Sequence, residues 1–303
     1  MTSPFVYDFG YPWPITWIHL VPIVVGLGAA ALGVRLGWRH WVVGLWGVIG
    51  IWGIVGLILT HTMMGGLNAP QRVPSDRFMA SGRGRVLDVG AGSGRALIGL
   101  LLARPQVTGT ALDIYTGFFG ITDNTPERMM RNARIAGVAD RADTVTADAT
   151  KMPLPDASYD AAISSYAIDH MGREGTPKAI QEVARVLKPN GEFLLEIVNP
   201  DIWVKVMMPI PHFGLNAHYR PDPTRWRAML KVAGFEVIEE GTGPGTLYWL
   251  ARKQQGPPAA AAGSARCRFP PRLFDHLSER IDDHEDEYLR ELRGQVCRGV
   301  PLL

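Results

Sequence analysis

Residues 86–95 read VLDVGAGSGR, an apolar run that ends in an aspartate and then turns through three alternating glycines. A turn of this kind between a strand and a helix places backbone N–H groups near a ligand. The dinucleotide fingerprint requires glycine where Arg95 stands, and a P-loop would continue with Gly-Lys-Ser/Thr, which this chain lacks. The turn therefore favours a carboxylate or the close approach of a nucleoside, and Asp88 could pair with a cationic amine.

Polar residues also follow the other expected strand ends. Asp113 stands 23 residues after Gly90, where a carboxylate can bind both hydroxyls of a ribose. Asp148 and Ala149 end the third expected strand, and Ser164 lies at the end of the fourth. Ligands of open α/β sheets bind beyond the carboxyl ends of the strands, so we expect these residues to share one site. A cofactor with a carboxylate, an amine, a ribose and an adenine, and without phosphate, would suit them.

Candidate acid–base residues lie in two places. His170 and Asp169 come directly after the fourth strand, and histidine titrates near neutral pH. The segment after the fifth strand adds His212, His218 and Tyr219. For each of them taken singly, a structural hydrogen bond is the favoured role. No metal is expected, because the two cysteines both fall in the last 40 residues, a usage that fits a reducing compartment.

The elements that must position these residues lie between residues 83 and 253, where strand-like and helix-like segments alternate. This pattern is typical of a parallel sheet with crossover helices. We expect helices after the first five strands, most clearly over 177–187, and a closing antiparallel pair at the end. The expected strands are 85–90, 107–114, 142–148, 159–166, 191–198, 235–241 and 246–252.

Four stretches carry a family resemblance: VLDVGAGSGRA, ALDI, TADATKMPLPDASYDAAISSYAIDHM and EVARVLKPNGEFLLEI. In this order they resemble the class I S-adenosylmethionine-dependent methyltransferases, closest to the branch with the ubiquinone/menaquinone methyltransferases. The resemblance covers about residues 83–253. It implies an α/β fold with a Rossmann-like, seven-stranded, mostly parallel sheet that carries helices on both faces. It also implies S-adenosyl-L-methionine as the cofactor.

The resemblance implies roles for individual residues as well. Gly90, Ala91 and Gly92 would contact the methionine part through their backbone, and Asp113 would hold the ribose. Asp148 and Ala149 would face the adenine, and Ser164 would close the methionine side. The complete expected cofactor-binding set is Asp88, Gly90, Ala91, Gly92, Gly94, Asp113, Ile114, Asp148, Ala149 and Ser164.

Two uncharged runs, 15–34 and 41–60, precede this domain. Each reaches roughly 20 residues, the length that a helix needs to cross about 30 Å of hydrocarbon. Buried helices of a soluble core rarely lack a polar face over such a length, and a signal peptide would carry early basic residues. We predict a transmembrane hairpin over 1–62 with tryptophans at its ends. The small residues that would let its helices approach are Gly26, Ala30, Gly33, Gly44, Gly47, Gly50, Gly53 and Gly56.

The rest of the chain connects or follows these units. Residues 63–82 read as a juxtamembrane linker, and 254–303 as a low-complexity linker with an acidic tail, either helical or solvated. The loop 115–124, with Phe118 and Phe119, precedes Thr125 and Pro126, an expected N-cap and first helical residue. This loop could be a lid, a membrane-dipping element or a packed loop without a role.

Features that the chain lacks narrow the possible classes of methyl acceptor. A net charge of +2 without a basic stripe does not indicate nucleic-acid binding. SSYA differs from the Asn/Asp-Pro-Pro-Tyr/Phe motif of the family's nucleic-acid amino-methyltransferases, and the domain lacks the cysteines of its arsenite enzymes. Residues 201–215, rich in Trp, Met and Phe, would form an apolar wall near the acceptor.

We therefore expect a two-pass membrane methyltransferase that acts on a lipophilic, quinone- or lipid-like molecule, with its catalytic domain in the cytoplasm. Basic residues on the two sides of the expected spans balance, so charge does not decide the orientation. The alternatives are an S-methyltransferase of small thiols or sulfide and a catalytically silent, cofactor-binding membrane scaffold. A weaker one is an NAD-dependent reductase. Protein partners are not indicated.

Overall fold

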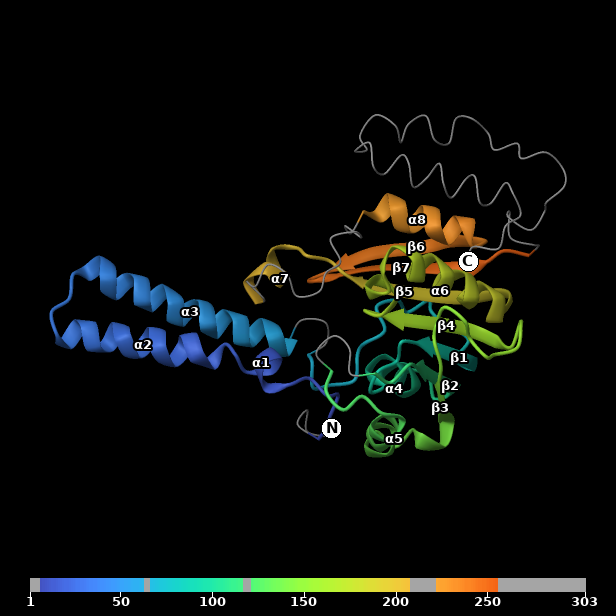
Figure 1. Cartoon of the computed structure of the whole chain (residues 1–303), viewed down its shortest axis with the longest axis horizontal. Coiled ribbons are helices and arrows are strands. Elements are labelled where there is room, and N and C mark those ends of the chain that lie inside the picture. Colours follow the sequence, from blue (N-terminus) through green and yellow to red (C-terminus); the bar gives the residue numbers. More distant parts are fainter. Residues whose placement is uncertain (1–5, 63–65, 117–120, 208–221, 256–303) are drawn as a thin grey trace, which may run out of the picture.

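A computed structural model describes residues 6–62, 66–116, 121–207 and 222–255 (Figure 1). Its centre is one seven-stranded sheet in the order β3-β2-β1-β4-β5-β7-β6. β1 to β5 run parallel, and β7 is antiparallel to both of its neighbours. The expected mostly parallel sheet and its closing antiparallel pair are confirmed. The strands are β1 Arg83–Val89, β2 Gln106–Asp113, β3 Ala142–Thr146, β4 Tyr159–Ser165, β5 Leu187–Val198, β6 Phe235–Gly243 and β7 Thr246–Lys253.

Helices cover both faces of the sheet because its strands are apolar on both sides. One core layer joins the sheet to α6 and α8 and includes Trp226 and Trp249. The other joins it to α4 and α5 and includes Leu97 and Met129. The helices of the domain are α4 Arg95–Ala103, α5 Pro126–Ile135, α6 Gly172–Val186, α7 Ile202–Met207 and α8 Pro223–Val232.

The local sequence correctly predicts the start of α5 but not the connection between β3 and β4. Thr125 caps α5, since its side chain accepts a hydrogen bond from the Arg128 N–H, and Pro126 is the first helical residue. The expectation of a helix after each of the first five strands is wrong for β3, because residues 147–158 between β3 and β4 contain none. Two reverse turns make this crossover instead.

The N-terminal hairpin consists of α2 Leu20–Arg35 and α3 His40–Thr62, preceded by the short α1 Trp13–Thr16. The first expected span is interrupted at residues 17–19, so α2 is 16 residues long, about 24 Å. Pro22 explains the break: within a longer helix its ring would clash with the carbonyl of Ile18, whereas the first turn of a helix tolerates it. Among the described residues, α3 alone is both long and apolar enough to cross a membrane.

Glycines form the contact between α2 and α3. A Cβ on Gly53 would lie 2.8 Å from the Ile23 side chain, and one on Gly26 would lie 2.5 Å from the Gly50 backbone. Gly33, Gly50 and Gly56 are similarly enclosed, as expected for closely packed helices. The prediction is wrong for Gly44 and Gly47, which have no such neighbour within 4 Å.

The remaining surface of the hairpin is apolar and exposed. Only 17% of the apolar window of α3 is buried, and large hydrophobic side chains are exposed around both helices. Buried core helices of soluble proteins do not show this exposure. The hairpin therefore projects from the domain as an apolar rod (Figure 1).

Both ends of the hairpin are held on the α/β domain. Before it, the Asp8 N–H donates to Asn132 Oδ1 at 3.1 Å, and Asn132 Nδ2 donates to the Asp8 carbonyl at 2.8 Å. After it, the Gln71 N–H donates to the Arg95 carbonyl at 3.0 Å. The two ends thus lie on the same side, and the loop between α2 and α3 lies at the far end.

Candidate cofactor and acceptor site

The glycine turn joins β1 to α4 and depends on left-handed backbone. Gly90, Gly92 and Gly94 have φ of +74°, +53° and +86°, values that favour glycine. A Cβ on Gly90 would also strike the Ala167 side chain. The sequence DVGAGSG therefore specifies a sharp strand-to-helix turn at the carboxyl edge of the sheet.

The N–H groups of this turn are already bonded within the protein. Gly90 and Ala91 both donate to the Leu112 carbonyl, at 2.8 and 3.1 Å, and Gly94 donates to the Ala91 carbonyl at 2.9 Å. Gly92 donates to Asp113 Oδ2 at 2.8 Å. These four N–H groups are thus engaged by β2, by Asp113 and by the turn itself. The expected backbone contacts of Gly90, Ala91 and Gly92 with the methionine part of the cofactor stay a prediction.

Asp113 at the end of β2 is oriented by three donors. Besides Gly92, the Tyr115 N–H donates to its Oδ1 at 2.7 Å and Asn124 Nδ2 donates at 3.1 Å. A carboxylate has about four acceptor positions, so capacity remains for a ligand hydroxyl. Asn124 was not identified from the sequence, since nothing local marks a loop amide as the partner of a carboxylate 11 positions earlier.

The ends of the neighbouring strands β2 and β3 lie side by side at Asp113. The Ala147 N–H donates to the Asp113 carbonyl at 3.0 Å, which places the end of β3 next to the end of β2. Ile114 is a large exposed apolar side chain, and Ala149 is buried. Asp148 Oδ1 accepts from the Thr150 N–H and hydroxyl, at 2.7 and 2.8 Å, and so holds the turn. The four expected nucleoside residues are thus brought together.

Ser164 is placed deeper than the others. It is fully buried, and its hydroxyl donates to the Val89 carbonyl at 2.9 Å. The side chain joins the end of β4 to β1, directly before the glycine turn. It supports the turn, and its role toward the methionine part stays a prediction.

Asp88 is a buried carboxylate with unused capacity. Its Oδ2 accepts from the Leu97 N–H at 3.0 Å at the start of α4, whereas its Oδ1 has no hydrogen-bond partner among the described residues. Burial is the main cause that raises the pKa of Asp88 to about 7, and the charge of Asp113 adds to it. A buried, unpartnered carboxylate oxygen suits a cationic amine, so the residues present fit a ligand with an ammonium group.

A second buried carboxylate, Glu196, lies at the end of β5. It is only 2% exposed, and Gln71 Nε2 donates to its Oε2 and to the Ser165 hydroxyl. Burial raises the pKa of Glu196 to about 8, opposed by the Ser165 hydrogen bond and by the charge of Arg95. The sequence analysis missed this residue. The signal was a glutamate inside the apolar run FLLEIV, where an acid needs a partner.

Asp169 and His170 link the segment after β4 to β5. Asp169 Oδ2 accepts from the Val198 N–H at 3.0 Å and lies 3.9 Å from His170 Nε2. Burial raises the pKa of Asp169, and the neighbouring His170 opposes this shift. The geometry gives Asp169 a positioning role, and the acid–base role of both stays a prediction. His212, His218 and Tyr219 lie outside the described residues, as do Phe118 and Phe119.

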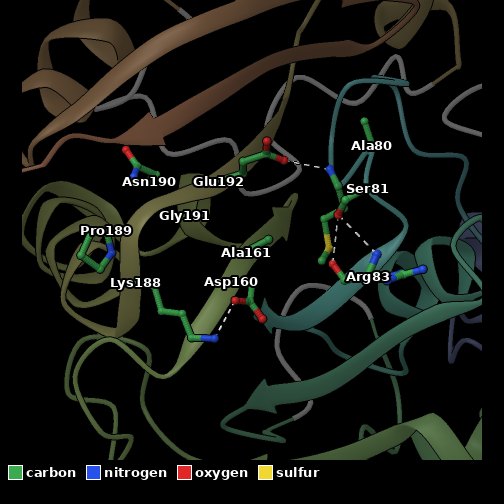
Figure 2. A pocket seen from close by; sticks show the side chains of 11 residues that line it. Ala80, Ser81, Arg83, Asp160, Ala161, Lys188, Pro189, Asn190, Gly191 and Glu192 are labelled. Carbon is green, nitrogen blue, oxygen red and sulfur yellow. Dashed lines mark hydrogen bonds and ion pairs between the residues drawn. The ribbon is translucent and has the colours of Figure 1, made fainter.

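A cavity of about 310 Å³ lies at the other edge of the sheet (Figure 2). Its walls come from the beginnings of β1 and β4 and from the first part of β5. Figure 2 shows Lys188 and Asp160 pointing toward each other, and their ion pair measures 2.6 Å. Because ligands of open α/β sheets bind at the carboxyl ends, this cavity is separate from the cofactor site. No cluster of potential metal ligands occurs among the residues the structure describes.

Comparison with known proteins agrees with this geometry. Residues 86–191 match the methyltransferase domain family. The ubiquinone/menaquinone biosynthesis C-methyltransferase UbiE of Methylobacterium nodulans is 31% identical over 177 residues, which are 51% of this chain and 66% of that protein. The demethylmenaquinone methyltransferase of Clavibacter sepedonicus is 27% identical over 204 residues, 59% of this chain and 78% of that protein. The chain carries a class I S-adenosylmethionine-dependent methyltransferase domain.

Two further similar proteins cover different shares of the chain. The sterol 4-C-methyltransferase strm-1 of Caenorhabditis elegans is 30% identical over 111 residues, 36% of this chain and 29% of that protein. The chain thus spans less than a third of this relative and 66% of the UbiE relative. A solved methyltransferase from Methanosarcina mazei is 19% identical with a TM-score of 0.45, covering 57% of this chain and 93% of its own. S-adenosylmethionine is the methyl donor of the domain.

Proposed function

We propose that this protein transfers the methyl group of S-adenosylmethionine to a lipophilic small molecule, quinone- or lipid-like, while it is anchored in a bilayer. The relatives named above include methyltransferases of quinone biosynthesis and of a sterol. The exposed apolar hairpin supports the anchor, because α3 spans 23 residues, about 35 Å, without a formal charge before its end.

One observation carries the proposal: the hairpin contacts α7, which follows the carboxyl end of β5. Trp52 Nε1, on α3, donates to the Val206 carbonyl on α7 at 3.0 Å. α7 follows β5 after a three-residue connection, and the carboxyl end of β5 carries Glu196. An apolar acceptor that leaves the bilayer along α3 would therefore reach the same edge of the sheet as the cofactor.

The chain's own residues have distinct tasks in this reaction. When bound, S-adenosylmethionine supplies a methyl group already activated on a sulfonium. Asp113 would accept hydrogen bonds from the ribose hydroxyls, and Asp88 would accept them from the ammonium group. The protein aligns the two reactants and excludes water.

An acceptor that must lose a proton needs a base near the strand ends. Glu196 is buried at this edge, and its pKa of about 8 makes it a stronger base than an exposed glutamate once it is ionised. His170 lies at the following turn, next to Asp169. An acceptor that is nucleophilic without proton loss would need neither.

We further propose that the domain lies on the cytoplasmic side, where S-adenosylmethionine is made. The hydrogen bonds of Asp8 and Gln71 hold both ends of the hairpin on the domain, which supports a two-pass arrangement. Arg35 and Arg39 then lie on the other side of the bilayer. Charge counts do not favour this orientation, so accessibility of Arg39→Cys to an impermeant thiol reagent in intact cells is its test.

The decisive experiment measures release of S-adenosylhomocysteine by the full chain in vesicles. We expect turnover with a membrane lipid extract and none with small soluble thiols. The Asp113→Ala variant serves as the inactive control. Turnover with thiols alone would establish the S-methyltransferase alternative and overturn the lipophilic acceptor. Cofactor binding without turnover on either would leave the scaffold function.

A further inference from the structure

The N-terminal segment 8–10 is joined to the glycine turn through one buried amide. Asn132 on α5 is fully buried, and its Nδ2 donates both to the Asp8 carbonyl at 2.8 Å and to the Ser93 carbonyl at 3.0 Å. Ser93 lies within the turn between β1 and α4. Both donors of the Asn132 amide are thus used, one for the N-terminal segment and one for the turn.

The Asp8 carboxylate holds this segment on α5 and shapes the bend that follows. Its Oδ2 lies 3.3 Å from Arg128 Nε and 3.1 Å from Arg131 Nη2. Its Oδ1 accepts from the N–H of Gly10, whose φ of +82° favours glycine. Because the Asp8 side chain is 53% exposed, we expect the hydrogen bond at the bend to matter more than the ion pairs.

At this bend, Gly10 lies directly against residues 121–124. The Gly10 carbonyl accepts from the Thr122 N–H at 2.8 Å and from the Thr122 hydroxyl at 3.2 Å. A Cβ on Gly10 would lie 2.8 Å from the Ile121 side chain and 2.9 Å from the Thr122 carbonyl oxygen. A larger residue at this position would therefore push the two segments apart.

Residues 121–124 in turn border two residues of the candidate cofactor site. Ile121 lies against the glycine turn, since its Cδ1 would be only 3.3 Å from a Cβ on Gly92. Asn124 is buried, and its Nδ2 donates to Asp113 Oδ1 at 3.1 Å. The contacts that begin at the N-terminal segment therefore reach the carboxylate that is predicted to bind the ribose.

We propose that Asp8 is a positioning residue of the cofactor site, because it keeps residues 121–124 in place beside Asp113. Cofactor binding and attachment of the N-terminal segment to α5 then stabilise each other, since coupling between two sites is reciprocal. The part of the chain that leads into the hairpin thus completes the site for S-adenosylmethionine. The inference rests on the predicted role of Asp113, and it requires neither the lipophilic acceptor nor the membrane anchor.

Isothermal titration of the full chain with S-adenosylmethionine in detergent micelles tests this inference. Asp8→Ala removes the acceptor at the bend, so we expect the Kd to rise about 3- to 10-fold, as for the loss of one hydrogen bond. Asp8→Asn keeps an acceptor for the Gly10 N–H and should restore the Kd to within about twofold of the wild type. Asp156→Ala is the matched control, since it removes an exposed Asp–Arg ion pair before β4, at the other edge of the sheet.

A double-mutant cycle tests the route by which Asp8 acts. Asn124→Ala removes the side chain that joins residues 121–124 to Asp113. If Asp8 acts through this segment, Asp8→Ala should change the Kd less in the Asn124→Ala background than in the wild type. An effect of equal size in both backgrounds would overturn the proposal, and so would an unchanged Kd for Asp8→Ala alone.

Hydrogen exchange measures the reciprocal effect without any turnover. Saturating S-adenosylmethionine should slow the exchange of the amides of residues 8–10 and of Thr122 several-fold in the wild type. The amides of β6, at the far edge of the sheet, should exchange as before. Exchange of residues 8–10 at the same rate with and without the cofactor would contradict the coupling and overturn the proposal.

These measurements separate the inference from the proposed function, because neither of them uses an acceptor. An unchanged Kd for Asp8→Ala in a protein that methylates a lipophilic acceptor would reject the inference and retain the function. A raised Kd for Asp8→Ala, reduced in the Asn124→Ala background, in a protein that methylates no such acceptor would do the reverse.

Discussion

The carboxylate of Asp113 accepts a hydrogen bond from the Gly92 N–H at 2.8 Å, so the end of β2 fixes the glycine turn that follows β1. Asp113 thus connects the two parts of the candidate cofactor site, the end of β2 and the glycine turn after β1. Asp113 keeps the backbone of the turn in place, and it is also the residue predicted to bind the ribose.

Replacement of Asp113 should therefore reduce cofactor affinity more than a single lost contact would. For Asp113→Ala we expect the Kd for S-adenosylmethionine to rise about 10- to 100-fold, since a hydrogen bond to a charged group contributes about 1.5–3 kcal/mol. Isothermal titration measures it. Asp140→Ala, an exposed aspartate before β3, is the control and should bind normally. Undiminished binding by Asp113→Ala would remove the central residue of the site.

The affinity for S-adenosylmethionine should depend on pH through Asp88. Because the pKa of Asp88 is about 7, its carboxyl must ionise before it can pair with an ammonium group. The Kd should fall as pH rises toward 7, by up to tenfold per pH unit. Asp88→Asn should bind weakly with little pH dependence. A wild-type Kd that is constant between pH 5.5 and about 7.5 would contradict the pairing.

Glu196 should make the fold less stable as pH rises. Its pKa is about 8 in the folded protein against an ordinary value of 4.5, so the folded state keeps a proton that the unfolded chain releases. The free energy of unfolding should fall between about pH 4.5 and 8, by at most about 1.4 kcal/mol per pH unit for this group.

The matched variant for this effect is Glu196→Gln, which keeps the shape and an acceptor for Gln71. In detergent micelles, raising the pH from 5.5 to 8 should lower the Tm of the wild type more than that of Glu196→Gln. The Tm of Glu196→Gln should still fall somewhat as pH rises, because burial also raises the pKa values of Asp88 and Asp169. Equal slopes in the two proteins would show that Glu196 is ionised in the folded state.

The sequence predicted what depends on local pattern. Alternating or continuous apolar runs placed all seven strands, and Thr125 with Pro126 placed the start of α5. The rule that ligands of open α/β sheets bind beyond the carboxyl ends of the strands directed attention to that edge of the sheet. The break in the first apolar run was also present locally, since Pro22 forbids a continuous helix through it.

What could not be predicted depends on contacts between distant residues. Gln71 and Glu196 are 125 positions apart, and no pattern in either segment indicates the other. The same holds for Trp52 and Val206, 154 positions apart, which join the hairpin to α7. The wrong prediction of a helix between β3 and β4 has another cause. Parallel strands are usually connected by a crossover helix, but here short turns make the connection.

The attachment of Asp8 to Asn132 has a consequence for how the protein is made. The two residues are 124 positions apart, so the hairpin between them leaves the ribosome long before α5 exists. If the hairpin is the membrane anchor proposed above, its insertion precedes this attachment, and the nascent domain folds while it is tethered to the bilayer. The N-terminal segment then closes onto α5 as a late, long-range step of biogenesis.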